Sequence, residues 1–556
     1  MPGNSTPIDA QVLIVGAGPV GLTLALDLAR RGIDVAVAEM RHAGEPPSVK
    51  CNQLSARSME IFRRLGIAGA VRSLGLPHDY ANDVVSCISA TGMELSRLRI
   101  PARGERFTSV QGADTWWPTP EAPHRINQTY LEPFLFAHAA AQARVRMLNR
   151  TVIERIEQDA RGVTAFARNL DTGAMSTIAA AYLVGCDGAR SITRKAIAAN
   201  LIGDTAIQYV QSTCIRAPDL VRRLPGRPAW LYFALNARRC GSLLAIDGRE
   251  TWIVHNWLYH GETDFESVDR DWAIRTILGV DEHFQYAIVS KEDWIGRRLV
   301  ADRFQHGRVF ICGDAAHLWI STGGYGMNAG IADAASLAWM LAAVLNGWAP
   351  PAILAAYEAE RQPITKQASR IIMDISLKVM QQRREITPDL EAPGAAGVAL
   401  RARIGKEAHA LDIQQQCCAG LNFGYYYDRS PIIAYDGEPA PAYTMGTFTS
   451  STVPGCRAPH VWLEGGRSLY DALGPDYTLV RTDPSERIDG IEAAARERRV
   501  PLAVVNVTGS AREAYPQKLV LIRPDQHVAW RGNDEPAAPL ALIDRVRGAL
   551  NPQGGT

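Results

Sequence analysis

The sequence predicts an α/β protein of several units: a domain with a parallel βαβ core, an inserted, mainly antiparallel sheet, and a separate C-terminal α/β module. Three observations lead to this prediction. A glycine-rich turn joins an apolar strand to a helix near the N-terminus, short β-rich runs fill residues 201–294, and a second strand–helix pattern begins near Gly465. The 556 residues exceed one typical domain, so the fold can enclose a large ligand.

The N-terminal pattern is a βαβ unit. Gln11–Val15 is a short apolar strand, Val20–Arg31 repeats apolar residues at helical spacing, and Ile33–Met40 alternates as a second strand. The turn between the first strand and the helix is GAGPVG. Its glycines therefore fall where the N-terminus of a helix can bind phosphate.

Within that turn, Gly16, Gly18 and Gly21 form GxGxxG, and Pro19 stands at the start of the helix. The first glycine permits a tight turn, the second lets the backbone approach a pyrophosphate, and the third lets the helix pack on the strand. Glu39 ends the second strand, where it can accept hydrogen bonds from an adenosine ribose. In this context the motif predicts a Rossmann-like domain for NAD, NADP or FAD.

A second segment selects FAD among these ligands. In RVFICGDAAHLWISTGGYGMNAGIADAASLAW, a strand places Asp314 at its carboxyl end, where it can bind a ribityl hydroxyl. The glycine-rich turn through Gly326 brings the main-chain N–H groups of Met327 and Asn328 to the start of a long helix. The positive end of a helix dipole favours the negative charge that reduced flavin carries.

A third segment, YLVGCDGARSITR, ends another strand with Asp187 and Gly188. Arg190 and Arg194 follow on a turn or helix, and they are candidates for contacting the pyrophosphate or an incoming nicotinamide dinucleotide. The alternative is a solvated helix face with ordinary surface pairing, which is the commoner situation for isolated arginines.

Together the three segments resemble the group A flavoprotein monooxygenases, the family of para-hydroxybenzoate hydroxylase and phenol hydroxylase. The resemblance runs through YEAERQP at Tyr357–Pro363 and assigns Arg57 and Gln128 to the flavin site. It implies reduction of FAD by NADPH or NADH, reaction with O₂ to a C4a-hydroperoxide, and transfer of one oxygen atom to a phenolic substrate.

The C-terminal third is similar to the thioredoxin-like domain that ends phenol hydroxylase. The likeness lies in PGCRAPHVWL and LVLIRPDQHVAWRG. A redox role is not expected, because no cysteine follows Cys456. The predicted boundaries are an FAD-binding domain in three parts (1–80, 111–200 and 296–375), a substrate domain (81–110 and 201–295), a helical segment and linker (376–464) and a thioredoxin-like domain (465–556).

The residues that would activate a phenol are the least defined part of the sequence. Asn52 stands where phenol hydroxylases carry an acidic residue, and Ile320 and Ser321 replace two prolines usual in relatives, so no carboxylate base is assumed. The candidate catalytic residues are His255 and Tyr232, which lie in predicted strands of the inserted sheet. Tyr259 is a further candidate beside those strands.

A structural role is the commoner situation for a lone histidine or tyrosine on a strand. We nevertheless formulate the hypothesis that a neutral-type partner such as His255, or a water relay, takes the phenol proton.

The amino-acid composition limits which classes of binding partner are expected. Lys plus Arg total 59 and Asp plus Glu 58, a formal net charge of +1 with no basic block, so neither nucleic acid nor an anionic membrane is expected. The N-terminal MPGNSTPIDA lacks a signal-peptide pattern, and no membrane span is predicted. Nine cysteines without a CxxC pair or zinc spacing indicate free thiols, no metal site and a cytoplasmic location. A homo-oligomer is left open.

The sequence also leaves other functions open. Epoxidation or Baeyer–Villiger oxidation of an aromatic polyketide-like substrate could use the same scaffold, and a non-catalytic flavin-binding protein is a further alternative. A simple pyridine-nucleotide dehydrogenase would bind NAD without flavin, which the segments around Asp187 and Asp314 disfavour.

Overall fold

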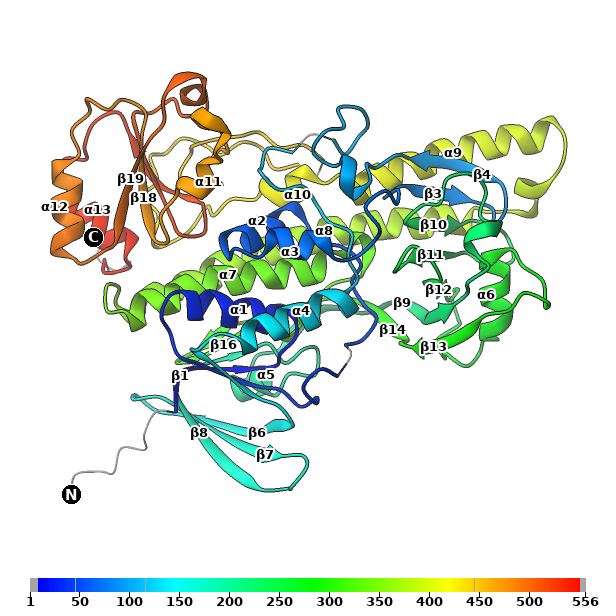
Figure 1. The fold of residues 1–556 in the computed structure, drawn as a ribbon, viewed down its shortest axis with the longest axis horizontal. Helices are drawn as coiled ribbons and strands as arrows, with labels where there is room; N and C mark the ends of the chain where they lie inside the picture. The colour runs from blue at the N-terminus through cyan, green and yellow to red at the C-terminus, as the bar shows by residue number, and fades with distance from the viewer. Residues whose placement is uncertain (1–8, 46, 116, 445, 551–556) are drawn as a thin grey trace.

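The computed structural model describes residues 9–550 except residues 46, 116 and 445, so the outer ends of the first and last predicted domains lie outside the described residues. Figure 1 shows an elongated arrangement, with the C-terminal module at one end, the inserted sheet at the other, and the long helices between them. Three sheets organise these parts. The predicted α/β architecture is confirmed.

The first sheet carries the predicted βαβ unit. Its order is β15-β16-β8-β1-β2-β5, and β6 and β7 extend it from β8. The strands are β1 (Ala10–Val15), β2 (Val35–Ala38), β5 (Val145–Leu148), β6 (Thr151–Gln158), β7 (Val163–Asn169), β8 (Met175–Gly185), β15 (Gln305–His306) and β16 (Val309–Ile311).

The central strands of this sheet are parallel and apolar. Val15 lies beside Ala38 on one side and Gly185 on the other, and Gly185 lies beside Ile311. Parallel strands buried on both faces need such continuous apolar runs. The register therefore brings the carboxyl ends of β2, β1, β8 and β16 to one edge.

Helices cover this sheet and connect it to the rest of the molecule. They are α1 (Pro19–Arg30), α2 (Ala56–Arg64), α3 (Ala68–Ser73), α4 (Gln128–Ala140), α5 (Ile192–Ala196), α7 (Tyr325–Leu345), α8 (Ala355–Arg384), α9 (Ala395–Gln416) and α10 (Ala419–Phe423). α8 continues to Arg384 because Ile372, Ile375 and Val379 prolong its buried stripe. The predicted boundary at residue 375 therefore falls inside this helix.

α7 is the most apolar helix. With the turn before it, Thr322–Leu345 is long and apolar enough to cross a membrane, but 78% of its most apolar window is buried inside the fold. Its Ile331, Leu337 and Trp339 are fully buried. Burial of this kind is typical of a core helix that is hydrophobic all round.

The second sheet is the inserted one, with the order β17-β14-β9-β12-β11-β10-β3-β4 and β13 paired to β9. Its strands are β3 (Val84–Cys87), β4 (Glu94–Leu98), β9 (Leu201–Arg216), β10 (Leu231–Ala234), β11 (Gly241–Ala245), β12 (Thr251–Trp257), β13 (Ala287–Lys291), β14 (Trp294–Ala301) and β17 (His317–Leu318). Among the described residues its strand pairs are antiparallel, except that β10 runs parallel to β3.

Different helices cover the two faces of this sheet. A Cβ on Gly241 of β11 would lie 2.3 Å from Ile277 of α6 (Arg270–Leu278). On the other face, Trp257 of β12 shares a hydrophobic cluster with Ile404 and Ala408 of α9. We call these the α6 face and the α9 face.

The C-terminal module has a four-stranded sheet in the order β19-β18-β20-β21, with β18 parallel to β19 and antiparallel to β20. Its elements are α11 (Leu469–Ala472), β18 (Tyr477–Arg481), α12 (Asp489–Glu497), β19 (Leu502–Asn506), β20 (Leu519–Ile522), β21 (Val528–Gly532) and α13 (Pro539–Val546). This mixed sheet with its helices is the predicted thioredoxin-like arrangement.

Candidate cofactor and substrate site

The glycines of the first turn form a cradle whose shape depends on missing side chains. Gly16 has a φ of +103°, and a Cβ there would lie 2.4 Å from the carbonyl oxygen of Cys186. A Cβ on Gly21 would lie 2.1 Å from the carbonyl oxygen of Gly16. By contrast, a Cβ on Gly18 meets nothing within 4 Å, so the start of α1 at Pro19 opens onto free space suited to a pyrophosphate.

Glu39 is held at the end of β2 as a charged acceptor. Its carboxylate accepts hydrogen bonds from the backbone N–H groups of Ala17 (2.8 Å) and Arg41 (2.9 Å) and from the Arg41 guanidinium. Burial alone would raise the pKa of Glu39, but the hydrogen bonds from Arg41 outweigh it and hold this pKa below its usual value. Glu39 is thus ionised at neutral pH.

Gln128 begins α4 and is linked to Glu39 by side-chain contacts. Its side-chain amide donates to Glu132 (2.7 Å), and its backbone N–H donates to the carbonyl of Cys51 (3.0 Å). Glu132 in turn pairs with Arg41 at 2.5 Å. This chain of contacts ties Gln128 to the segment that carries Glu39.

Asp314 follows β16, and it is exposed on one side although protein surrounds it on others. The desolvation by these surroundings raises its pKa above the usual value. Close by, Cys51 lies against the backbone N–H of Met327 near the start of α7. Gly326 has open space where its Cβ would be.

The Asn328 side chain fixes the loop that faces α7. Its Oδ1 accepts hydrogen bonds from the N–H of Ser55 (2.8 Å) and the hydroxyl of Ser58 (2.7 Å), and its Nδ2 donates to Gly324 (2.8 Å). Because the side chain is engaged in this way, Asn328 can offer a cofactor only its main chain, as the sequence predicts.

The third segment lies between the other two. Asp187 accepts two 3.0 Å hydrogen bonds from Thr193 through one oxygen, and within the described chain its other oxygen has no hydrogen-bond partner. Gly188 has a φ of +71°. Arg194 is buried and donates to the carbonyls of Ala315 (3.1 Å) and Ala189 (2.8 Å), so it joins the Asp187 and Asp314 segments.

Arg190 is exposed on the turn after Gly188. Of the two predicted nicotinamide candidates it is therefore the one with a side chain at the surface. The buried Arg194 holds protein carbonyls, which excludes the solvated helix face that was its alternative interpretation.

FAD fits this edge of the sheet. The segments that end with Gly16, Glu39, Asp187 and Asp314 follow four adjacent strands, whose carboxyl ends meet at one edge. Ligands of open α/β sheets bind outside such edges. The free space over Gly18, the open Asp314 carboxyl and the spare oxygen of Asp187 provide room and acceptors for a long dinucleotide with hydroxyl groups.

The two candidate catalytic residues lie on opposite faces of the inserted sheet. Tyr232 pairs with Leu243, which pairs with Val254, so these side chains share the α6 face. His255 is next to Val254 on β12 and therefore points to the α9 face. The Tyr232 hydroxyl accepts a 2.7 Å hydrogen bond from the N–H of Ala229. The side chain of Tyr232 thus lies on the face away from α9, and its catalytic role stays a prediction.

Only His255 remains on the side where α9 meets the cofactor domain. A Cβ on Gly323, in the turn before α7, would lie 3.1 Å from the carbonyl of Gln415 in α9. The imidazole packs edge-on to Trp294, and its Nδ1 is buried without a hydrogen-bond partner among the described residues. Burial lowers its pKa to about 4, so the ring is neutral at pH 7.

Comparisons with known proteins agree with this geometry. Residues 9–371 match the model of the FAD binding domain, and residues 451–550 match that of the aromatic-ring hydroxylase C-terminal domain. The chain belongs to the FAD-dependent aromatic-ring hydroxylases. It is therefore an FAD-dependent monooxygenase, as the resemblance implied.

The alignments with named relatives cover almost the whole length of this chain. FAD-dependent monooxygenase apdD of Emericella nidulans is 30% identical, over 94% of this chain and 87% of that protein. Phenol 2-monooxygenase of a Pseudomonas species is 29% identical, over 99% and 94% respectively. The rebeccamycin biosynthetic enzyme RebC with reduced flavin is 34% identical, with a TM-score of 0.88 over 98% of this chain and all of that chain.

Arg57 of α2 contacts the C-terminal module. Its guanidinium donates to Glu60 (2.8 Å), to the carbonyl of Asp525 (2.6 Å) and to the side chain of Gln526. Ser55 and Ser58 on the same helix turn bind Asn328, and the assignment of Arg57 to the flavin site stays a prediction.

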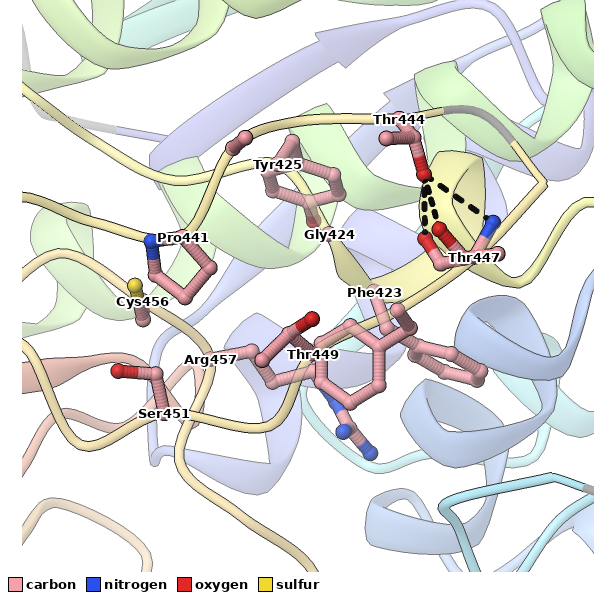
Figure 2. Close-up of a pocket in the computed structure, with 12 residues that line it drawn as sticks. Phe423, Gly424, Tyr425, Pro441, Thr444, Thr447, Thr449, Ser451, Cys456 and Arg457 are labelled. Atoms are coloured by element: carbon pink, nitrogen blue, oxygen red, sulfur yellow. Dashed lines mark hydrogen bonds between the residues drawn. The ribbon is translucent and has the colours of Figure 1, made fainter.

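Two cavities lie near the contact between α2 and the C-terminal part of the chain. One lies between α10 and the following loop, near Phe423, Thr447 and Arg457 (Figure 2). Its volume is about 10 Å³, room for one water. The other, about 50 Å³, reaches from Arg57 and Arg361 to Trp319 and Tyr325 near the start of α7. Neither has the size of an aromatic substrate.

The remaining sequence candidates have structural roles. Asn52 accepts a 2.6 Å hydrogen bond from the side chain of Asn127, the residue that caps α4. The Tyr259 hydroxyl accepts from the N–H of Cys240 at 3.1 Å, and Arg239 stacks on its ring. In the part of the chain that the structure describes, no group of His, Cys, Asp and Glu could hold a metal.

Sequence reasoning missed two buried charged residues on the substrate side. Asp412 of α9 accepts a 3.2 Å hydrogen bond from Ser86 on the α9 face, and burial raises its pKa to about 7. Arg125 lies just before α4 with no hydrogen-bond partner among the described residues. No local pattern marks Asp412, whereas Arg125 stands three positions before Gln128 in the segment that carries the family resemblance.

Proposed function

We propose that this hydroxylase inserts one atom of O₂ into a phenolic small molecule and reduces the other to water with NADPH or NADH. The observation that supports it is the FAD cradle at one edge of the first sheet, with the α9 face of the inserted sheet, which carries His255 and contacts Asp412, on the side where α9 approaches the turn before α7. Bound FAD supplies the reactivity toward O₂, while the protein must position the ring and exclude water.

The residues have separate tasks in this proposal. Glu39 holds the adenosine ribose, and the main-chain N–H groups at the start of α1 hold the pyrophosphate. Asp314 binds a ribityl hydroxyl, and the N–H groups of Met327 and Asn328 stabilise negative charge on the pyrimidine side of the reduced ring. Arg190 is the candidate for an approaching nicotinamide dinucleotide.

Two groups on the α9 face are candidates for accepting the phenol proton. His255 is neutral at pH 7, but its pKa of about 4 makes it a weak base. Asp412 has a pKa of about 7, the range in which general bases act best. We expect Asp412→Asn to lower the hydroxylation rate about tenfold or more and to remove a pH dependence near 7.

Under this assignment His255→Ala leaves the rate and its pH profile unchanged. Stopped-flow measurement of product formation between pH 5.5 and 8.5 checks both variants. If Asp412→Asn leaves the rate of product formation unchanged and His255→Ala removes its pH dependence, the assignment is reversed.

A panel of phenols, resorcinols and hydroxybenzoates tests the proposed function itself. The purified holoenzyme should oxidise NADPH or NADH faster with at least one of them and release a hydroxylated product. Stimulated oxidation that yields only oxygen-insertion products of other kinds would favour epoxidation or Baeyer–Villiger chemistry. No stimulation by any phenol, with no product, would contradict the proposal.

We further propose that the enzyme acts in the cytoplasm. Its nine cysteines are all free in the structure, as is usual in a reducing compartment. A homo-oligomer remains a prediction, which light scattering on the purified holoenzyme decides.

A further inference from the structure

Arg125 is a buried cation without an ordinary structural partner. It follows the short bridge between Leu54 and His124, and its side chain is 3% exposed. Among residues 9–550 as described, none of its three guanidinium nitrogens has a hydrogen-bond partner. A guanidinium carries five N–H donors, so leaving them all unused in the interior is costly.

One carboxylate acts electrostatically on Arg125 but does not compensate its charge in full. Asp114 lies within electrostatic reach of Arg125, but it is bound to Arg106 at 2.5 Å. Two guanidiniums therefore share one carboxylate. Burial lowers the pKa of Arg125 to about 10, which leaves it protonated at neutral pH. The site thus holds one uncompensated positive charge.

The position of Arg125 is the junction between the cofactor domain and the substrate sheet. Its guanidinium stacks over the ring of Trp230, 4.0 Å from the centroid, at the start of β10. Tyr325 at the start of α7 and Cys417 at the end of α9 also lie within electrostatic reach. The stacked indole holds the guanidinium plane and leaves its N–H edge for another group.

We propose that Arg125 recognises a carboxylate on the aromatic substrate. This inference rests on the proposed function and specifies its substrate class as an aromatic acid. A carboxylate would receive two parallel hydrogen bonds from the guanidinium edge and neutralise the extra charge. The pyrophosphate of FAD is an unsuitable partner, because the glycine turn that receives it lies at the start of α1 and not beside α9.

The test compares acids with their methyl esters on the oxidised holoenzyme. Salicylate, 3-hydroxy-2-naphthoate and a hydroxyanthraquinone carboxylate, each with its ester, are titrated while the flavin absorbance is followed. The wild type should bind at least one acid about tenfold or more tightly than its ester, as expected of charge-assisted hydrogen bonds. Arg125→Met keeps the packing on Trp230 and should abolish this preference.

A matched control and a stability measurement accompany the titrations. Arg249→Met removes an exposed arginine from the turn between β11 and β12 and should preserve the preference. Because Arg125→Met removes an unpaired buried charge, its melting temperature should equal or exceed that of the wild type. Its FAD content should be unchanged.

Three results would overturn the inference. They are an acid preference that survives in Arg125→Met, equal binding of every acid and its ester by the wild type, and loss of FAD or of thermal stability in Arg125→Met. If no probe perturbs the flavin, the melting temperature decides between a ligand-binding and a structural cation. Absence of turnover would count against the proposed function alone, because the titration needs none.

Discussion

The cofactor cradle and the contact between the C-terminal module and helices α2 and α8, here called the joint, are held together differently. Closely packed glycine backbone forms the cradle, whereas buried charged side chains form the joint. In the cradle, Gly16 and Gly21 let backbones approach to distances that no side chain tolerates. In the joint, charged side chains meet: Arg523 pairs with Glu360 at 2.6 Å and with Asp525 at 2.7 Å, and all three are almost fully buried.

The joint is connected to the flavin site by a chain of hydrogen bonds. Asp525 and Gln526 bind Arg57 of α2, and Ser55, which caps α2, binds Asn328 near the start of α7. The C-terminal module is thus connected to the start of α7 through α2. The comparison teaches that the cradle depends on local sterics, whereas the joint depends on pairings between distant residues.

The largest expected effect is in the cradle. Gly21→Ala places a Cβ about 2.1 Å from the backbone oxygen of Gly16, so the turn must open and FAD binding should be lost. The flavin-to-protein ratio of the purified variant measures this. Gly69→Ala is the matched control, since a Cβ there meets nothing within 4 Å. Normal flavin content in Gly21→Ala would break the steric account of the cradle.

The stability of the joint should depend on its buried ion pairs. Arg523→Met leaves Glu360 and Asp525 buried without their main partner, which should cost about 3–5 kcal/mol of stability. Thermal unfolding and limited proteolysis of the C-terminal module report it. Arg487→Met, which removes an exposed pair with Asp489, should leave both unchanged. Equal behaviour of the two variants would contradict the role given to the buried cluster.

Acid should loosen the joint before the cradle. His527 packs on Tyr427 in the joint, and burial lowers its pKa to about 4. Unfolded histidine takes up a proton near pH 6.5, so this group adds stability above that pH, and the addition is lost as pH falls toward 4. The loss is at most about 1.4 kcal/mol per pH unit.

His527→Gln should therefore reduce the pH dependence of the melting temperature between pH 6.5 and 4. Flavin fluorescence, which reports release of FAD, should change at lower pH than proteolysis of the joint. Release of FAD before the joint opens would reverse the order that the comparison predicts.

The same contrast explains what the sequence could reveal. Gly16, Glu39, Asp187 and Asp314 each follow a recognisable strand, so their meeting at one edge was predictable. The face of the inserted sheet on which Tyr232 lies was not predictable. Strand alternation assigns side chains to two faces but does not say which face meets the cofactor domain. The contacts of Arg57 lie 468 and 469 residues away in the chain, beyond any local pattern.

Buried charges on the substrate side were equally hidden. Asp412 belongs to a helix with little amphipathic pattern, and its raised pKa arises from packing against the inserted sheet. Arg125 stands among residues recognised for the flavin, but its missing partners become visible only in three dimensions.

The central claim is that this flavin-binding chain transfers an oxygen atom from O₂ to an aromatic ring. The most direct test is mass spectrometry of the product formed by the holoenzyme under ¹⁸O₂ with NADPH or NADH and an accepted phenol. One ¹⁸O atom per hydroxylated product, with one reduced nicotinamide consumed, is the predicted result. A product whose new oxygen comes from water, or consumption of the nicotinamide without any product, would contradict the account.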